Sequence, residues 1–110
     1  ERLKARIVKH KLTAFEMKLT DWRKGLSQAY RYGFFADRAI LVLPPNTSAT
    51  AAKSKSLFQQ LGVGLWSFDS ESGKIRKLVG AKSSVARDAV ARAKAVDLIC
   101  RRFNFGKARK

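Results

Sequence analysis

The feature that most constrains the fold is a run of five apolar residues, 39–43, which ends at Pro44 and Pro45. A short, continuous apolar run that stops at prolines is typical of a strand covered on both faces. It is also the longest apolar run in the chain, far below the ~20 residues that would cross a bilayer. We therefore expect a fold organised around one buried strand, and no membrane partner.

Two extended segments are predicted before this run. Residues 6–8 form a short β-branched stretch, residues 9–11 resemble a turn, and residues 12–19 form a second strand. Alternation along the second strand gathers a mostly apolar set on one face, which we expect to meet the core: Thr13, Phe15, Met17 and Leu19. The opposite face carries Glu16 and Lys18, two residues apart.

A helix is predicted between the second strand and the buried strand. It should begin after Thr20 or Asp21 as the N-cap and run to about Tyr32, before Gly33. Spacing at i, i+4 and i+7 predicts a buried stripe of Trp22, Leu26 and Ala29. Successive i+4 steps form a separate polar stripe of Lys24, Gln28 and Tyr32.

A second helix and a hairpin should follow the buried strand. The helix is expected from a cap at Thr47 or Ser48 to Leu61, with a stop at Gly62. Its inward residues are predicted to be Ala49, Ala52 and Leu57. Residues 63–68 and 74–79 are predicted to pair as antiparallel strands across the turn at residues 69–73.

A last helix completes the predicted order. It should begin at Ser83 or Ser84 and end near Phe103. The apolar face expected for it comprises Val85, Ala89, Val96, Cys100 and Phe103. Together the segments predict one small α/β domain over residues 1–110, with a mixed β-sheet and helices on both faces.

Charge is the strongest global signal. Lysine and arginine number 24 against 8 acidic residues, which gives a formal net charge of +16. A folded domain this basic attracts polyanions, and nucleic acid is favoured over a membrane because no basic segment carries a large apolar face. The alternative is that the excess lysine only keeps the protein soluble. The single cysteine, Cys100, excludes a disulfide framework and fits a reducing compartment, so we expect a cytoplasmic protein.

Glu16 and Lys18 are the residues best suited to chemistry. Side chains two apart on a strand point the same way, so a carboxylate and an ammonium would share one face. Such a pair suits phosphodiester cleavage, since Glu16 can hold Mg²⁺ and Lys18 can orient water and offset charge. The alternative is a plain salt bridge worth roughly 0–1 kcal/mol.

In this context the chain resembles the PD-(D/E)XK nuclease superfamily over residues 12–43. The stretch 15–32 is similar to the family core, in which a strand ends in Glu-x-Lys and a helix follows, and Gln28-x-x-x-Tyr32 is similar to a glutamine–tyrosine motif of helicase-linked members. The resemblance implies a restriction-endonuclease-like core and a bound Mg²⁺ or Mn²⁺. It further implies that Glu16 and the Met17 carbonyl bind the metal, Lys18 positions the water, Gln28 reaches the site and Tyr32 braces it.

One family residue has no counterpart here. The family places an aspartate on the preceding strand, but residues 2–15 contain no acid. Because the chain begins at Glu1 and its single methionine is Met17, we expect the aspartate to lie upstream of Glu1. The alternative is that the metal site has been lost.

These features favour a metal-dependent DNA endonuclease. The alternatives are a catalytically inactive DNA-binding module of the same fold and, on charge alone, a structural RNA-binding protein. A homodimer is compatible with the sequence. With His10 as the sole histidine and no P-loop motif, a histidine-metal nuclease is disfavoured and a P-loop hydrolase is excluded. The residues expected to contact DNA are Lys11, Arg23, Lys24, Tyr32, Lys53, Lys55, Arg87 and Lys94.

Overall fold

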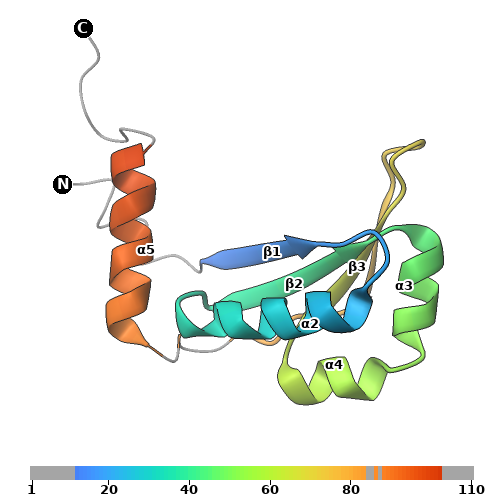
Figure 1. Cartoon of the computed structure of the whole chain (residues 1–110), viewed down its shortest axis with the longest axis horizontal. Coiled ribbons are helices and arrows are strands. Elements are labelled where there is room, and N and C mark those ends of the chain that lie inside the picture. The colour runs from blue at the N-terminus through green and yellow to red at the C-terminus, as the bar shows by residue number, and fades with distance from the viewer. Residues whose placement is uncertain (1–11, 84–85, 87, 103–110) are drawn as a thin grey trace, which may run out of the picture.

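The computed structural model describes residues 12–83, 86 and 88–102, and its centre is a four-stranded sheet, which lies beside α2, α3 and α4 in Figure 1. The strands are β1 (Thr13–Met17), β2 (Arg38–Leu43), β3 (Gly64–Phe68) and β4 (Ile75–Val79). They lie in the order β1-β2-β3-β4, with β1, β2 and β3 parallel and β4 antiparallel to β3. The mixed α/β class and the antiparallel hairpin predicted from the sequence are both confirmed.

Helix α2 (Trp22–Arg31) connects β1 to β2 and continues into a short 3₁₀ helix, η1 (Tyr32–Phe34). Its start follows the predicted cap, because the Lys24 amide donates to Oδ1 of Asp21 at 3.2 Å. The predicted stripe of Trp22, Leu26 and Ala29 is buried. The local signals in this segment therefore located the helix and its packed side correctly.

Two short helices, α3 (Pro45–Ala52) and α4 (Lys55–Leu61), connect β2 to β3 where one helix was expected. Pro45 at the first turn suits a helix start, since its missing N–H is not needed there. The inward residues are Ser48, Ala51 and Phe58, one position away from each predicted residue. Phe58 is fully buried and stacks on Trp22 with ring centroids 5.9 Å apart, because packing this large ring buries more apolar area than packing Leu57.

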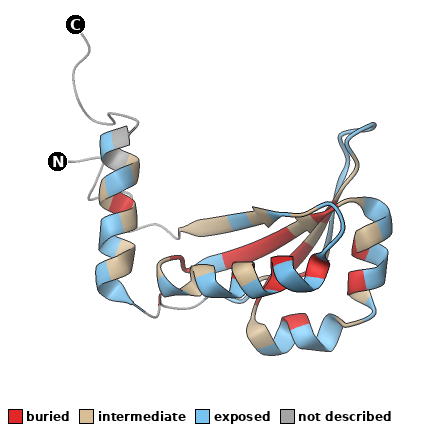
Figure 2. Cartoon of the chain, in the orientation of Figure 1, coloured by how far each residue is buried: buried red, intermediate tan, exposed pale blue. Residues whose placement is uncertain are grey.

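The core lies on one face of the sheet, between the strands and helices α2, α3 and α4 (Figure 2). One cluster joins residues of all three helices to the strands: Trp22, Leu26, Ala29, Ala39, Leu41, Leu43, Ala51, Phe58, Val63, Leu65 and Val79. Two successive right-handed crossovers in the same direction place their helices on the same side. Helices α2, α3 and α4 therefore all cover the same face of the sheet, and the expectation that they would be divided between both faces is wrong.

The orientation of β1 also differs from the prediction. Glu16 pairs with Leu41, so these residues share the helix-covered face. Phe15 and Met17 lie on the opposite face and are 49% and 65% exposed, although they were expected to meet the core. Alternation showed that the two sides differ, but the covered side depends on where the crossover helices pack.

The described part of the C-terminal segment centres on α5 (Ala89–Arg102). Its cap is Asp88, which accepts from the amides of Val90 and Ala91 at 3.0 Å, so it begins later than predicted from Ser83 or Ser84. Val96 is buried as predicted, whereas Ala89 is exposed. The predicted strand at residues 6–8, together with Val85, Phe103 and the Cys100 side chain, lies outside the described residues.

An ion pair ties α5 to the start of the sheet. Arg92 Nη2 lies 3.1 Å from Asp37 Oδ2, and the same carboxylate accepts from the Leu12 amide at 2.7 Å. Asp37 is buried, so these partners offset the cost of removing its charge from water. In the described ranges, no helix is long and apolar enough to cross a bilayer.

Candidate active site

Glu16 and Lys18 lie side by side at the C-terminal end of β1. The Lys18 Nζ is 3.7 Å from Glu16 Oε2; the Lys18 side chain is 27% exposed and the Glu16 side chain is 14% exposed. The Lys18 amide donates to the Val42 carbonyl at 3.2 Å, which holds this residue in register one position beyond the strand. Strand alternation thus brings the carboxylate and the ammonium together, with both still reachable from solvent.

Tyr32 reaches the same carboxylate from the end of α2. Its hydroxyl donates to Glu16 Oε1 at 2.5 Å. This hydrogen bond, with burial and the nearby Glu16 charge, raises the pKa of Tyr32 above its usual 10.0. Tyr32 therefore stays protonated and orients Glu16 so that Oε2 faces Lys18.

Gln28 lies one helical turn before Tyr32 on the same side of α2. Its side chain is half-buried, and its Oε1 atom is buried without a hydrogen-bond partner in the described chain. A buried carbonyl oxygen without a partner is costly and is therefore a candidate to accept a hydrogen bond or bind a cation. The structure thus brings Glu16, Lys18 and Tyr32 together, with Gln28 one turn before Tyr32 on α2.

Gly25 allows this contact to be close, and the sequence prediction missed it. A Cβ at Gly25 would lie 2.7 Å from Leu41 Cδ1 and 2.8 Å from Lys18 Cγ. Without a side chain at this position, α2 packs directly on Leu41 and on the stem of Lys18. The available signal was a glycine inside a strong helix pattern, which often marks close packing.

The Met17 carbonyl points toward the edge of β1 that no described strand pairs. In a trans peptide the carbonyl of one residue and the N–H of the next point in opposite directions. The chain has no cis peptide bond in its described residues, and the Lys18 N–H points to β2. The Met17 carbonyl therefore points away from β2 and takes no part in the hydrogen bonds between β1 and β2.

The oxygen atoms at this site are of the chemical type that a hard divalent cation binds. The Glu16 carboxylate, the Met17 carbonyl and the Gln28 amide oxygen are all oxygen donors, which Mg²⁺ and Mn²⁺ prefer. Over residues 12–83, 86 and 88–102, however, no group of three or more His, Cys, Asp or Glu side chains could hold a metal. To match the metal ligands that the resemblance implies, the oxygen donors at Glu16 would still need a second carboxylate.

The basic residues expected to contact DNA occupy several elements. Arg23 and Lys24 are exposed in the first turn of α2, at the same end of the sheet as Lys18, and the Arg23 guanidinium lies 4.5 Å from the Trp22 ring centroid. Lys53 is exposed between α3 and α4, Lys55 is exposed as the first residue of α4, and Lys94 is exposed on α5. Lys11 and Arg87 lie outside the described residues.

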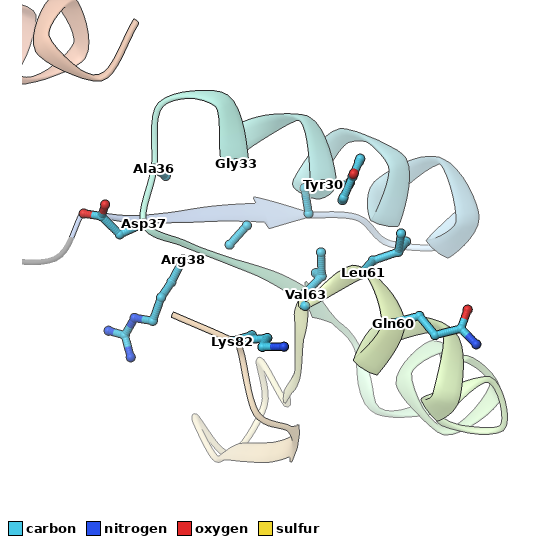
Figure 3. Close-up of a pocket in the computed structure, with 12 residues that line it drawn as sticks. Tyr30, Gly33, Ala36, Asp37, Arg38, Gln60, Leu61, Val63 and Lys82 are labelled. Carbon is cyan, nitrogen blue, oxygen red and sulfur yellow. The ribbon is translucent and has the colours of Figure 1, made fainter. Parts of the chain in front are cut away.

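Two cavities mark opposite ends of the parallel strands. A cavity of about 410 Å³ lies at their carboxyl ends, where Lys18 lines it with Pro44, Phe68 and Glu71 among others. A smaller one of about 110 Å³ lies at their amino ends, with Asp37, Arg38 and Lys82 around it (Figure 3). Ligands of open α/β sheets bind outside the carboxyl ends, so the cavity beside Lys18 is the one relevant to the site.

Comparisons with protein-family models, with curated proteins and with solved structures found no match to this chain. A functional assignment therefore depends on the residues and their geometry. The strongest element of that geometry is the contact of β1 with the end of α2, which unites a carboxylate, an ammonium and a phenol.

Proposed function

We propose that this domain is a metal-dependent DNA endonuclease that hydrolyses phosphodiester bonds at the end of β1. The observation that carries the proposal is the 3.7 Å approach of Lys18 to Glu16, with Tyr32 holding the second carboxylate oxygen. A partly exposed acid next to an amine that lines a cavity is suited to a substrate that brings both a phosphate and a water molecule.

Each residue has a distinct role in the proposed site. Glu16 and the Met17 carbonyl would hold Mg²⁺ or Mn²⁺, which when bound lowers the pKa of water and polarises the phosphate. Lys18 would position the attacking water and offset the negative charge that develops on the phosphate oxygens. Tyr32 keeps the Glu16 carboxylate oriented, and Gln28 supplies an acceptor for a group entering the site.

The net charge of +16 supports DNA as the substrate. Arg23 and Lys24 flank the proposed site at the start of α2, where they would neutralise phosphates next to the one cleaved. Such contacts position the backbone and carry no sequence information. We therefore expect cleavage with little base preference.

The second candidate is a DNA-binding module without catalysis. It is favoured by one observation, the lack of a three-ligand acidic cluster among the described residues. In this case the Glu16–Lys18 pair would be an ion pair that anchors β1 beneath α2. The two functions share the same basic surface and differ in whether DNA is cut.

The experiment that separates them is nicking of supercoiled plasmid in Mg²⁺ or Mn²⁺. We expect the wild type to nick the plasmid and Lys18→Ala to lose about 10²- to 10³-fold in rate, because charge stabilisation at the phosphate is removed. Lys82→Ala is the matched control, since Lys82 is an exposed lysine at the other end of the strands. Plasmid binding by Lys18→Ala should persist.

Two results would count against the endonuclease. Equal nicking by Lys18→Ala and wild type would place the chemistry elsewhere. Tight binding by the wild type with intact plasmid in both metals would favour the binding module.

A further inference from the structure

The sheet face opposite α2, α3 and α4 carries an unusual concentration of apolar side chains. Strand pairing aligns Met17 with Val42 and Val42 with Trp66, while Phe15 lies in the preceding row and Ile75 pairs with Phe68. Phe15, Met17 and Ile75 are 49%, 65% and 54% exposed. A contiguous apolar surface of this kind marks an interaction site.

The surface is hollowed and aromatic. A cavity of about 240 Å³ is lined only by apolar residues, which are Phe15, Met17, Val42, Trp66, Phe68 and Ile75. The rings of Phe15 and Trp66 meet edge to face, with centroids 5.3 Å apart. Flat aromatic groups on an open sheet provide platforms on which nucleobases stack.

The charges on this face are positive. Lys77 pairs with Trp66 and places its Nζ 4.9 Å from the centroid of the Trp66 ring. Arg38 is exposed at the start of β2, and its Nε donates to Thr13 Oγ1 at 3.1 Å. In the four described strands, β1 to β4, no acidic residue lies on this face; Asp69 and Glu71 lie beyond Phe68 in the turn.

We propose that this face binds single-stranded DNA, with bases stacked on Phe15 and Trp66 and phosphates near Lys77 and Arg38. Aromatic groups with flanking cations fit an unpaired strand, whose bases are free to stack, better than a duplex, whose bases are already paired. A second copy of the chain fits less well, because each copy carries +16. The choice of DNA over RNA rests on the proposed function, whereas the stacking mode does not.

The position of the face connects it with the proposed active site. The cavity beside Lys18 and the apolar cavity share Met17, Val42 and Phe68. An unpaired strand leaving the site could therefore pass directly onto the aromatic platform. This arrangement implies that substrates with a single-stranded segment bind more tightly than blunt duplexes.

The test is tryptophan fluorescence quenching by short oligo-dT, measured in EDTA so that no cleavage occurs. Trp22 is only 6% exposed, so quenching should report stacking on Trp66. We expect Phe15→Ala to raise the Kd for oligo-dT about fivefold or more, as loss of one stacking platform does. Its Kd for a blunt duplex should not change, and Leu57→Ala, an exposed apolar residue on α4, is the matched control.

Several outcomes would overturn the proposal. The first is equal affinity of Phe15→Ala and Leu57→Ala for oligo-dT, and the second is tighter binding of oligo-U than of oligo-dT. The third is a concentration-dependent dimer that the Phe15→Ala substitution dissociates, together with no quenching by oligo-dT. Circular dichroism confirms that each variant is folded. Because oligo-dT binding is measured on the uncut strand in EDTA, a wild type that binds oligo-dT but does not nick plasmid would contradict the proposed function and leave this proposal intact.

Discussion

Glu16 is held between a proton donor and a cation. Tyr32 donates to one carboxylate oxygen and Lys18 lies near the other, so the carboxylate is oriented by two elements at once. Glutamine at position 16 could still accept from Tyr32, and we expect that variant to fold. Alanine would leave the Tyr32 hydroxyl without its acceptor, which is the more damaging change.

The raised pKa of Tyr32 makes a prediction about pH. In the unfolded chain Tyr32 titrates near its ordinary value of 10.0, while the folded chain keeps the proton to higher pH. The stability from this bond should be complete below about pH 10 and be lost as pH rises through the folded pKa. Tyrosinate absorbance in Tyr30→Phe, in which Tyr32 is the remaining tyrosine, measures the midpoint.

Adding Glu16→Ala to that variant provides the control for the titration. Removal of both the acceptor and the charge should shift the midpoint back toward 10.0. A midpoint that does not move would mean that Tyr32 is not bonded to Glu16 in solution.

At the scale of elements, the site depends on how closely α2 approaches β1 and β2. Leu41 and the Lys18 stem fill the space where a side chain of residue 25 would lie. The helix therefore sets the distance from Gln28 and Tyr32 to the strand. Asp37 and Arg92 perform a similar linking role for α5 at the other end of the sheet.

Gly25→Ala tests this packing. Overpacking should cost about 1–3 kcal/mol, against a gain of up to about 1 kcal/mol in helix propensity, so we expect a net loss of stability. Urea unfolding measures it, with Ser27→Ala on the exposed side of α2 as control, expected within about 0.5 kcal/mol of wild type. If Gly25→Ala were more stable than the wild type, α2 would not be in close contact with Leu41.

At the scale of the whole molecule, the proposed function relies on the charge distribution to attract DNA. The excess of basic over acidic residues produces a positive field around the entire domain. In that proposal, Arg23 and Lys24, which are exposed beside the end of β1, would determine which phosphates lie at the site. We therefore expect the affinity for DNA to depend on salt concentration. Substitution of a residue that contacts a phosphate should change this salt dependence, whereas substitution elsewhere should not.

We predict that the logarithm of duplex affinity falls linearly with the logarithm of salt concentration. Lys24→Gln should reduce the magnitude of the slope by about 1, because one phosphate contact is lost. Lys82→Gln, at the opposite strand ends, should leave it unchanged. Fluorescence anisotropy across a salt series provides the measurement, and equal slopes for wild type and Lys24→Gln would exclude α2 from the interface.

Local sequence determined much of this architecture. Alternation along β1 put Glu16 and Lys18 on one side, Asp21 capped α2, and Gly62 ended α4 with a φ of 74° that glycine adopts without strain. Each of these features depends on residues within about one helical turn of one another, so short-range rules suffice. The same rules predicted the hairpin of β3 and β4.

The tertiary structure alone decided which side of β1 is covered. Two crossovers of the same hand stacked α2, α3 and α4 on the Glu16 side and left Phe15 and Met17 exposed. The contact of Tyr32 with Glu16, the burial of Phe58 and the fit of Gly25 against Leu41 are equally non-local. They depend on how elements distant in the chain pack in space, which a periodic pattern within one element does not specify.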